Sequence, residues 1–365
     1  HTWNVAEIIG GSPVNGKVPI GGMQVGCAFV KNDIPVCVGI NGEIALLSKP
    51  PMLEDGISEF KKLTGHVAPI AGMAIDFSTG HMFTADTDGI ICSFDLASNT
   101  ALTRYSSTED MLGKIHGGAA ISGITVVGSK VLTCGWDDTI RMASLNGDML
   151  RESIALEAQP NAIHTGTNLT VVVTVGGLVM ITDGSSAKPM LNIDYSALCV
   201  AVSPDDSTVY VGGEDCKVHI YAVSGDRLEL KHTIESAHLK PVHALALSND
   251  GTKLASADVR DICVWNLDQN YATIIGKSRW CFHTQRITCL DWSPDDSVLA
   301  SGGADDSIFL WSLTKKMKRL HYSFSHRGGV TGLHFMKEGW TLVSVGNDGC
   351  VNQWDLRDDV AKKFG

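Results

Sequence analysis

Two adjacent carboxylates, Asp305 and Asp306, lie in a short turn between the apolar runs of SGGADDSIFLW at residues 301–311. Paired carboxylates can hydrolyse glycosides as acid and nucleophile, and they can also bind a metal ion. However, adjacent residues of a strand project to opposite faces, so these two groups would not flank one glycosidic bond. The spacing therefore argues against a hydrolase and directs attention to the elements that hold the two acids.

The surroundings of Asp305 recur along the chain. Residues 283–313 and 326–356 both contain a histidine, two strands joined by a turn, an aspartate turn, and a strand that ends in tryptophan. In both, a serine precedes the aspartate by four residues and a tryptophan follows it by six. Eight repeats can be counted, with further copies at 66–96, 116–145, 196–223 and 238–267 and degenerate ones at 24–48 and 158–183.

Each repeat consists of short apolar or alternating strands bounded by turns such as SPDD, SNDG and DG, with almost no helical periodicity. One small antiparallel sheet cannot bury both faces alone, but sheets arranged radially cover one another. The sequence thus predicts an all-β protein, a β-propeller with four-stranded antiparallel blades.

This pattern resembles the WD-repeat family, with Gly65-His66 and Trp354-Asp355 as partial matches to its two signature dipeptides. The resemblance implies a hydrogen-bonded network of histidine, serine or threonine, aspartate and tryptophan in each repeat, so that Asp305 is structural. In the repeat at 238–267 either Asp258 or Asp261 could close the turn. The expected network residues are His66, Thr84, Asp88, His116, Thr133, Asp137, Asp215, His238, Ser256, Trp265, His283, Ser301, Asp305, Trp311, His326, Ser344, Asp348 and Trp354.

Composition limits the other functions. A formal charge of −11 disfavours duplex nucleic acid, and no apolar stretch is long enough for a membrane helix. Ten cysteines without a CxxC pair favour free thiols over disulfides or a zinc site. GSPVNGK at 11–17 has phosphate-loop spacing but carries Val18 where magnesium needs a hydroxyl, so no nucleotide cofactor is expected. Neither catalytic nor metal-binding residues are predicted.

A closer resemblance extends over essentially the whole chain. The stretches at 209–225 and 278–311, together with VLTCGWDDTIRM, are similar to the C-terminal half of the actin-interacting protein 1 family. That resemblance implies a cytoplasmic, non-enzymatic protein of the actin cytoskeleton that binds cofilin-decorated filaments and promotes their disassembly. Its partners would be actin filaments and cofilin-family proteins, without nucleic acid or membrane. A generic WD-repeat scaffold for another complex is the alternative.

The same family has two seven-bladed propellers, which suggests a domain division. Residues 1–56 are expected to be the tail of a preceding propeller, and residues 57–365 a seven-bladed ring closed by a strand at 58–64. An eight-bladed ring closed by residues 5–9 is the competing arrangement. Because HTWNV begins within an apparent strand and lacks an initiator methionine, the chain is expected to be part of something longer.

Two features are candidate partner contacts. Trp136 precedes the turn residue Asp137, where an aromatic side chain would face outward, unless it packs on a neighbouring blade. The run KKMKR supplies Lys315, Lys316, Lys318 and Arg319, which could meet an acidic protein surface or simply be solvated.

Overall fold

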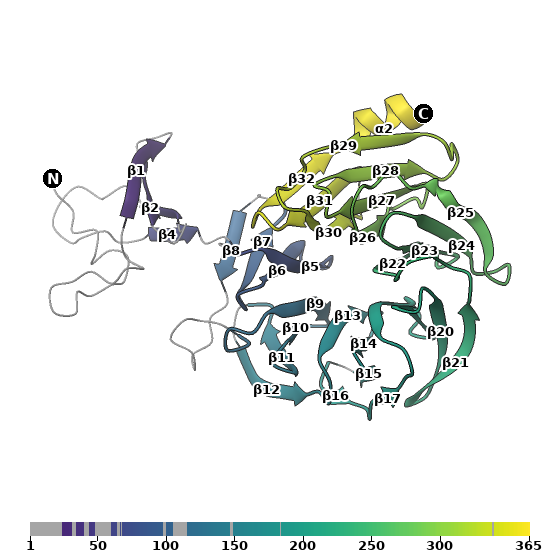
Figure 1. The fold of residues 1–365 in the computed structure, drawn as a ribbon. Coiled ribbons are helices and arrows are strands. Elements are labelled where there is room, and N and C mark those ends of the chain that lie inside the picture. Colours follow the sequence, from purple (N-terminus) through teal and green to yellow (C-terminus); the bar gives the residue numbers. More distant parts are fainter. Residues whose placement is uncertain are drawn as a thin grey trace, which may run out of the picture.

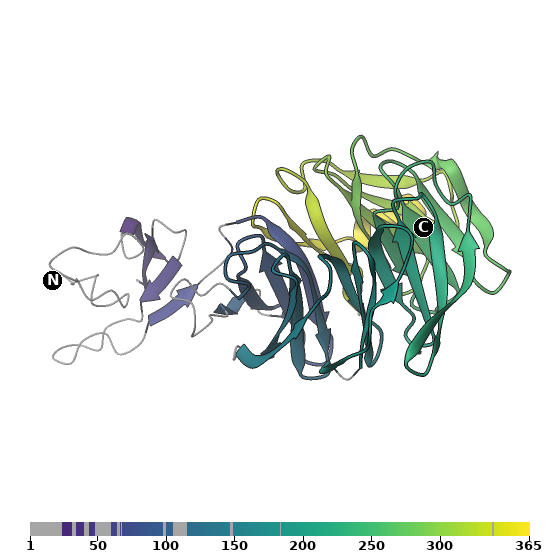
Figure 2. The ribbon, with the colours of Figure 1, turned by 60° about the horizontal axis from the view of Figure 1, so that its bottom comes forward.

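A computed structural model describes residues 24–30, 34–39, 44–47, 60–63, 66, 68–97, 100–104, 115–146, 149–182, 184–337 and 339–365. Seven small antiparallel sheets form a ring, and the first strand of each sheet faces the centre (Figure 1). Turned by 60°, the same sheets stand side by side as blades (Figure 2). The prediction of a seven-bladed β-propeller is confirmed.

The blades follow one another in chain order. Six contain four strands or, in the third, three strands and two short segments that both pair with β15. Their strands are β5 (Ile70–Asp76), β6 (His81–Asp86), β7 (Ile91–Asp95), β8 (Thr100–Arg104), β9 (Ile121–Val127), β10 (Lys130–Gly135), β11 (Thr139–Ser144), β12 (Met149–Ala155), β13 (Pro160–Thr165), β14 (Leu169–Thr174), β15 (Gly177–Thr182), β16 (Ser186–Ala187), β17 (Leu191–Asn192), β18 (Ala197–Val202), β19 (Thr208–Gly213), β20 (Val218–Ser224), β21 (Arg227–Ile234), β22 (Ala244–Leu247), β23 (Lys253–Ala257), β24 (Ile262–Asn266), β25 (Ala272–Trp280), β26 (Ile287–Trp292), β27 (Val298–Gly303), β28 (Ile308–Ser312), β29 (Arg319–Tyr322), β30 (Val330–Phe335), β31 (Thr341–Gly346) and β32 (Val351–Asp355).

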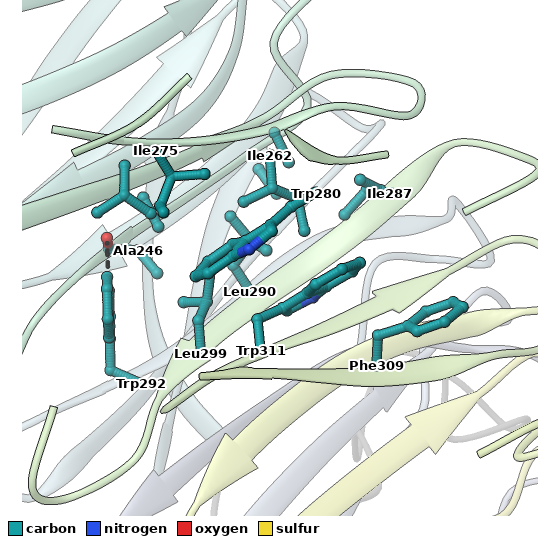
Figure 3. Close-up of a cluster of buried hydrophobic side chains, with 14 residues drawn as sticks. Ala246, Ile262, Ile275, Trp280, Ile287, Leu290, Trp292, Leu299, Phe309 and Trp311 are labelled. Atoms are coloured by element: carbon teal, nitrogen blue, oxygen red, sulfur yellow. Dashed lines mark hydrogen bonds between the residues drawn. The ribbon is translucent and has the colours of Figure 1, made fainter. Parts of the chain in front are cut away.

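The core lies between neighbouring blades. The middle strands β14 and β27 are buried at every residue, because another blade covers each of their faces. Figure 3 shows one such layer, between the β22–β25 and β26–β29 blades, where the rings of Trp280 and Trp311 stack with their centroids 5.4 Å apart. In the same layer the indole N–H of Trp292 donates to the carbonyl of Ala246 at 3.2 Å, which ties the two blades together.

The last blade closes the ring against the first. The hydroxyl of Thr331, in β30, donates to the carbonyl of Ile70, in β5, at 2.7 Å. The prediction that a strand at 58–64 adds to this last blade is wrong. Strand β4 (Phe60–Leu63) instead pairs with β3 (Ile44–Leu47) in a separate sheet with β1 (Gln24–Val30) and β2 (Ile34–Gly39). That pairing assigns residues 60–63 to the sheet before the ring, whereas the domain boundary at 57 stays a prediction.

Within the described residues the last blade therefore has three strands, and the competing strand at 5–9 lies outside them. Helix α2 (Arg357–Phe364) follows β32 and lies outside β29 (Figure 1). Its buried face joins Leu356 and Val360 to the core of the last two blades. The hydroxyl of Tyr322 in β29 donates to the carboxylate of Asp359 at 2.7 Å and fixes the start of the helix.

Two negative findings hold for the described part of the chain. None of its helices is long and apolar enough to cross a membrane. Cys134, Cys199, Cys263 and Cys289 form no disulfide, and burial raises the pKa of each to about 12.

Candidate functional site

The recurring polar residues meet in hydrogen-bonded chains inside the blades. In the β26–β29 blade the indole N–H of Trp311 donates to Ser301 Oγ at 2.8 Å, and Ser301 lies 2.8 Å from His283 Nε2. His283 Nδ1 lies 3.0 Å from Asp305 Oδ1. Because a carboxylate only accepts, Nδ1 carries the proton and Nε2 accepts from the serine hydroxyl. Each donor in this network of four side chains thus has an acceptor.

Two further blades repeat this four-residue arrangement. In the last blade, Trp354 donates to Ser344 at 2.9 Å, and His326 lies 2.7 Å from Ser344 and 2.9 Å from Asp348. In the β22–β25 blade the corresponding residues are His238, Ser256 and Trp265. There His238 Nδ1 lies 3.2 Å from Asp258 Oδ2, within ion-pair distance but without the geometry of a hydrogen bond, so Asp258 rather than Asp261 occupies the aspartate position.

The first two blades lack the tryptophan. His116 lies 2.7 Å from Asp137 and 3.0 Å from Thr133, as expected from the sequence. In the first blade His66 lies 2.6 Å from Thr84, but its aspartate partner is Asp86 at 2.8 Å and not the predicted Asp88. The backbone N–H of Asp88 instead donates to Asp86 Oδ1.

The residue two positions after the serine or threonine decides which aspartate is used. Where this residue is glycine, the aspartate that contacts the histidine is four residues after the serine or threonine. A Cβ atom on Gly135 or Gly303 would lie 2.5 or 2.6 Å from the histidine Nδ1. Where it is aspartate, as at Asp86 and Asp258, that residue itself contacts the histidine. The absence of glycine after Thr84 is therefore the physical reason why Asp88 was the wrong choice, and this signal was present in the sequence.

The β18–β21 blade has a different arrangement around Asp215. Tyr195 stands before its first strand, and the ring of Tyr195 stacks on His219 at 3.8 Å. Asp215 Oδ2 lies 3.0 Å from His219 Nε2, and the hydroxyls of Tyr195 and Tyr221 are 2.8 Å apart. The histidine here is in β20, whereas in the other networks it precedes the first strand of the blade. Asp215 therefore also has an imidazole partner.

The pKa shifts within the networks favour the charged form of Asp305 and the neutral form of His116. Burial opposes the charge of Asp305, yet hydrogen bonds from His283, Thr284 and Ser307 hold the pKa of its carboxyl below the usual value. For His116, burial lowers the pKa, and the nearby Asp137 offsets this only in part. Because Ser301 and His283 are fully buried, a substrate cannot reach them, and this network does not offer it an acid or base. No group of three or more histidine, cysteine or carboxylate residues in the described ranges could hold a metal ion.

The turns beside the networks expose side chains instead. Trp136 lies between Gly135 and Asp137, and its side chain is 60% exposed. Its backbone N–H donates to the carbonyl of Ala120. Val175 has the same position in the next blade, is 49% exposed, and donates to Gln159. Two neighbouring blades thus present apolar side chains at equivalent turns. Sequence reasoning missed Val175 because its degenerate repeat lacks the aspartate that marks the turn.

The predicted basic run lies in the turn from β28 to β29. Lys316, Lys318 and the intervening Met317 are exposed, whereas Lys315 and Arg319 are half-buried. The guanidinium of Arg319 covers the ring of Phe282, with 3.4 Å between its carbon and the ring centroid. The turn is on the opposite rim of its blade from the Asp305 turn, because both ends of strand β28 are turns. Trp136 and the basic run are therefore separate features.

The ring of antiparallel blades and the repeated histidine–aspartate chains define a WD-repeat β-propeller. Two parts of the chain, residues 194–222 and 277–312, match the family described as WD domain, G-beta repeat.

The relatives match over nearly the whole chain. Actin-interacting protein 1 of Drosophila melanogaster is 28% identical over 359 residues, which cover 97% of this chain and 55% of the relative. WD repeat-containing protein 1-B of Xenopus laevis is 29% identical over 361 residues, 97% of this chain and 57% of the relative. The 66 kDa stress protein of Physarum polycephalum is 28% identical over 332 residues, 90% and 52% respectively. The resemblance to the actin-interacting protein 1 family is thereby confirmed, and the chain spans about half the length of these curated relatives.

Proposed function

We propose that the chain is a non-enzymatic part of the actin cytoskeleton that binds cofilin-decorated actin filaments and promotes their disassembly. The observation that carries the proposal is the alignment of 97% of the chain with relatives named actin-interacting protein 1 from Drosophila melanogaster and Caenorhabditis elegans. On this proposal the partners are actin and a cofilin-family protein, the location is the cytoplasmic actin cytoskeleton, and neither nucleic acid nor membrane takes part.

The internal chemistry supports a binding role. The carboxylates and imidazoles that could react, such as Asp305 and His283, are partners of one another, and their side chains are almost fully covered. A rigid surface that touches actin and cofilin together would favour the decorated filament by its differential affinity. A tenfold preference corresponds to about 1.4 kcal/mol, which one well-placed aromatic contact can supply.

Trp136 is our candidate for such a contact, together with Val175 at the equivalent turn of the next blade. An exposed tryptophan on a rigid turn offers a large apolar area at little cost in conformational entropy. Because the side chain is 60% exposed, its truncation should leave the ring folded.

Co-sedimentation with filamentous actin, with and without cofilin, tests the proposal. We expect the chain to pellet more with cofilin-decorated filaments than with bare ones, and Trp136→Ala to weaken that difference several-fold. Lys231→Ala, at an exposed position of β21, is the control for a surface substitution. Pelleting that is indifferent to cofilin would contradict the proposal and leave the chain as a WD-repeat scaffold of another complex.

A further inference from the structure

A basic groove runs between the turn before β29 and the last turn of α2. It is an open pocket of about 510 Å³, lined by Met317, Lys318, Arg319, Leu320, His321, Lys362 and Lys363. Two segments more than forty residues apart in the chain thus form one surface, because Tyr322 and the apolar face of α2 hold the helix against β29.

Four cations line this groove in a chain whose formal charge is −11: Lys318, Arg319, Lys362 and Lys363. In the described part of the chain none of the four lies within ion-pair distance of a carboxylate side chain; the ion pairs there involve other residues. Lys318 donates to the carbonyl of Lys363 at 3.1 Å, which orients this lysine without neutralising it. The acids of α2 are in its first turn and its lysines in its last.

The groove also has an apolar part. Met317 is 79% exposed, and Leu320 contributes a half-buried side chain. Strand β29 is the outermost strand of its sheet, and α2 lies against it. An extended segment that lies in the groove between them can contact the side chains of both.

From these features we propose that the groove binds an acidic, extended segment of a partner protein that carries an apolar side chain among its carboxylates. The carboxylates pair with Lys318, Lys362 and Lys363, and the apolar side chain covers Met317. The guanidinium of Arg319, held flat on Phe282, keeps its N–H edge for a two-point contact with a carboxylate. This inference does not depend on the proposed role with actin.

Charge and shape favour a short acidic segment over other anions. Interactions with exposed charges fade over about 8 Å at physiological salt, so a short segment responds to the local cations. A nucleic acid duplex or an anionic membrane extends further and meets the net negative charge of the rest of the chain. The cations lie on two segments that line an open groove, and a phosphate group would make no apolar contact with Met317.

The test measures fluorescence anisotropy of a labelled twelve-residue peptide of aspartate and glutamate with one central leucine. Further probes are the same peptide with all acids replaced by amides, hexametaphosphate, and vesicles of phosphatidylserine. The groove variant is Lys318→Gln/Lys362→Gln/Lys363→Gln. Its control, Lys231→Gln/Lys240→Gln/Lys277→Gln, makes the same change in net charge elsewhere on the ring. Met317→Ser tests the apolar contact, and circular dichroism verifies that each variant is folded.

We expect the acidic peptide to bind, the groove variant to weaken it at least about tenfold, and the control to change it less than about twofold. Met317→Ser should weaken the peptide about three- to fivefold and leave hexametaphosphate unaffected. Equal losses in the two triple variants would overturn the inference, because binding would then reflect overall charge. It would also be overturned if the peptide failed to bind, or if vesicles or hexametaphosphate bound at the groove more tightly than the peptide.

Discussion

Replacement of Ser301 by alanine tests the structural role of the buried networks. Ser301 is fully buried, and its hydroxyl both accepts from Trp311 and contacts His283 Nε2. Without it, the indole N–H and the imidazole nitrogen lose their partners at sites that are at most 1% exposed, where water cannot replace them. Each unsatisfied buried group costs about 1 to 3 kcal/mol, so we expect a loss of about 2 to 5 kcal/mol in unfolding free energy.

Thr133→Val provides an internal comparison. Thr133 contacts His116 Nε2 at 3.0 Å, but its blade has an alanine, Ala143, at the tryptophan position. Only one buried group is left unpaired by this nearly isosteric change, so the expected loss is about half that of Ser301→Ala. The double variant Ser301→Ala/Trp311→Phe removes the indole N–H as well and should cost less than the sum of its two single changes.

The assay is urea denaturation followed by circular dichroism, with thermal midpoints as a second measure. For a ring of this size, 1 kcal/mol corresponds to roughly 1 to 2 °C. The reasoning is refuted if Ser301→Ala is as stable as the unchanged chain, or if Thr133→Val costs more than Ser301→Ala. Either result would mean that the networks are not held together by mutual satisfaction of buried polar groups.

Three further results are expected. Gly135→Ala should cost about 1 to 3 kcal/mol in the same assay, because its Cβ would lie 2.5 Å from His116 Nδ1, whereas Gly176→Ala, with nothing within 4 Å, should be close to neutral. Hydrogen bonds lower the pKa of Asp305 and Asp348 against the effect of burial, so their stabilisation should be complete above about pH 4 and lost as the pH falls through their lower folded values, measured by urea midpoints between pH 7 and 3. Since burial lowers the pKa of His116, as it does those of His164 and His243, the unfolded chain takes up these protons first, and stability should begin to fall below about pH 6.5; His116→Gln should remove only the share of His116 in this decline.

Much of the ring could be predicted from one spacing. A serine or threonine four residues before an aspartate recurs because glycine leaves room for the imidazole and the carboxylate reaches it from the turn, as at Asp137, Asp305 and Asp348. The same rule failed at Asp88, because an aspartate two residues after the threonine, Asp86, can also contact the histidine. Side-chain reach permits both solutions, and only the missing glycine distinguishes them.

Pairings between distant segments could not be predicted in this way. Strand β4 has an apolar and basic pattern that suits either neighbouring sheet, and its pairing with β3 depends on tertiary packing. Lys362 and Lys363 are more than forty residues from the basic run in the sequence, but the docking of α2 on β29 brings them to it. A charge cluster assembled from two segments leaves no local signal.

The arrangement of each turn separates stability from recognition within a few residues. Gly135 and Asp137 are committed to His116, while the residue between them, Trp136, has no role in the network and projects outward. The corresponding positions carry Val175 in the next blade, Ala304 beside Asp305, and Asn347 beside Asp348. Because the network fixes the backbone on both sides, this position can vary without loss of the fold. A ring built in this way can acquire a partner by substitutions at its turns alone, because the network aspartates, Asp305 among them, hold those turns rigid.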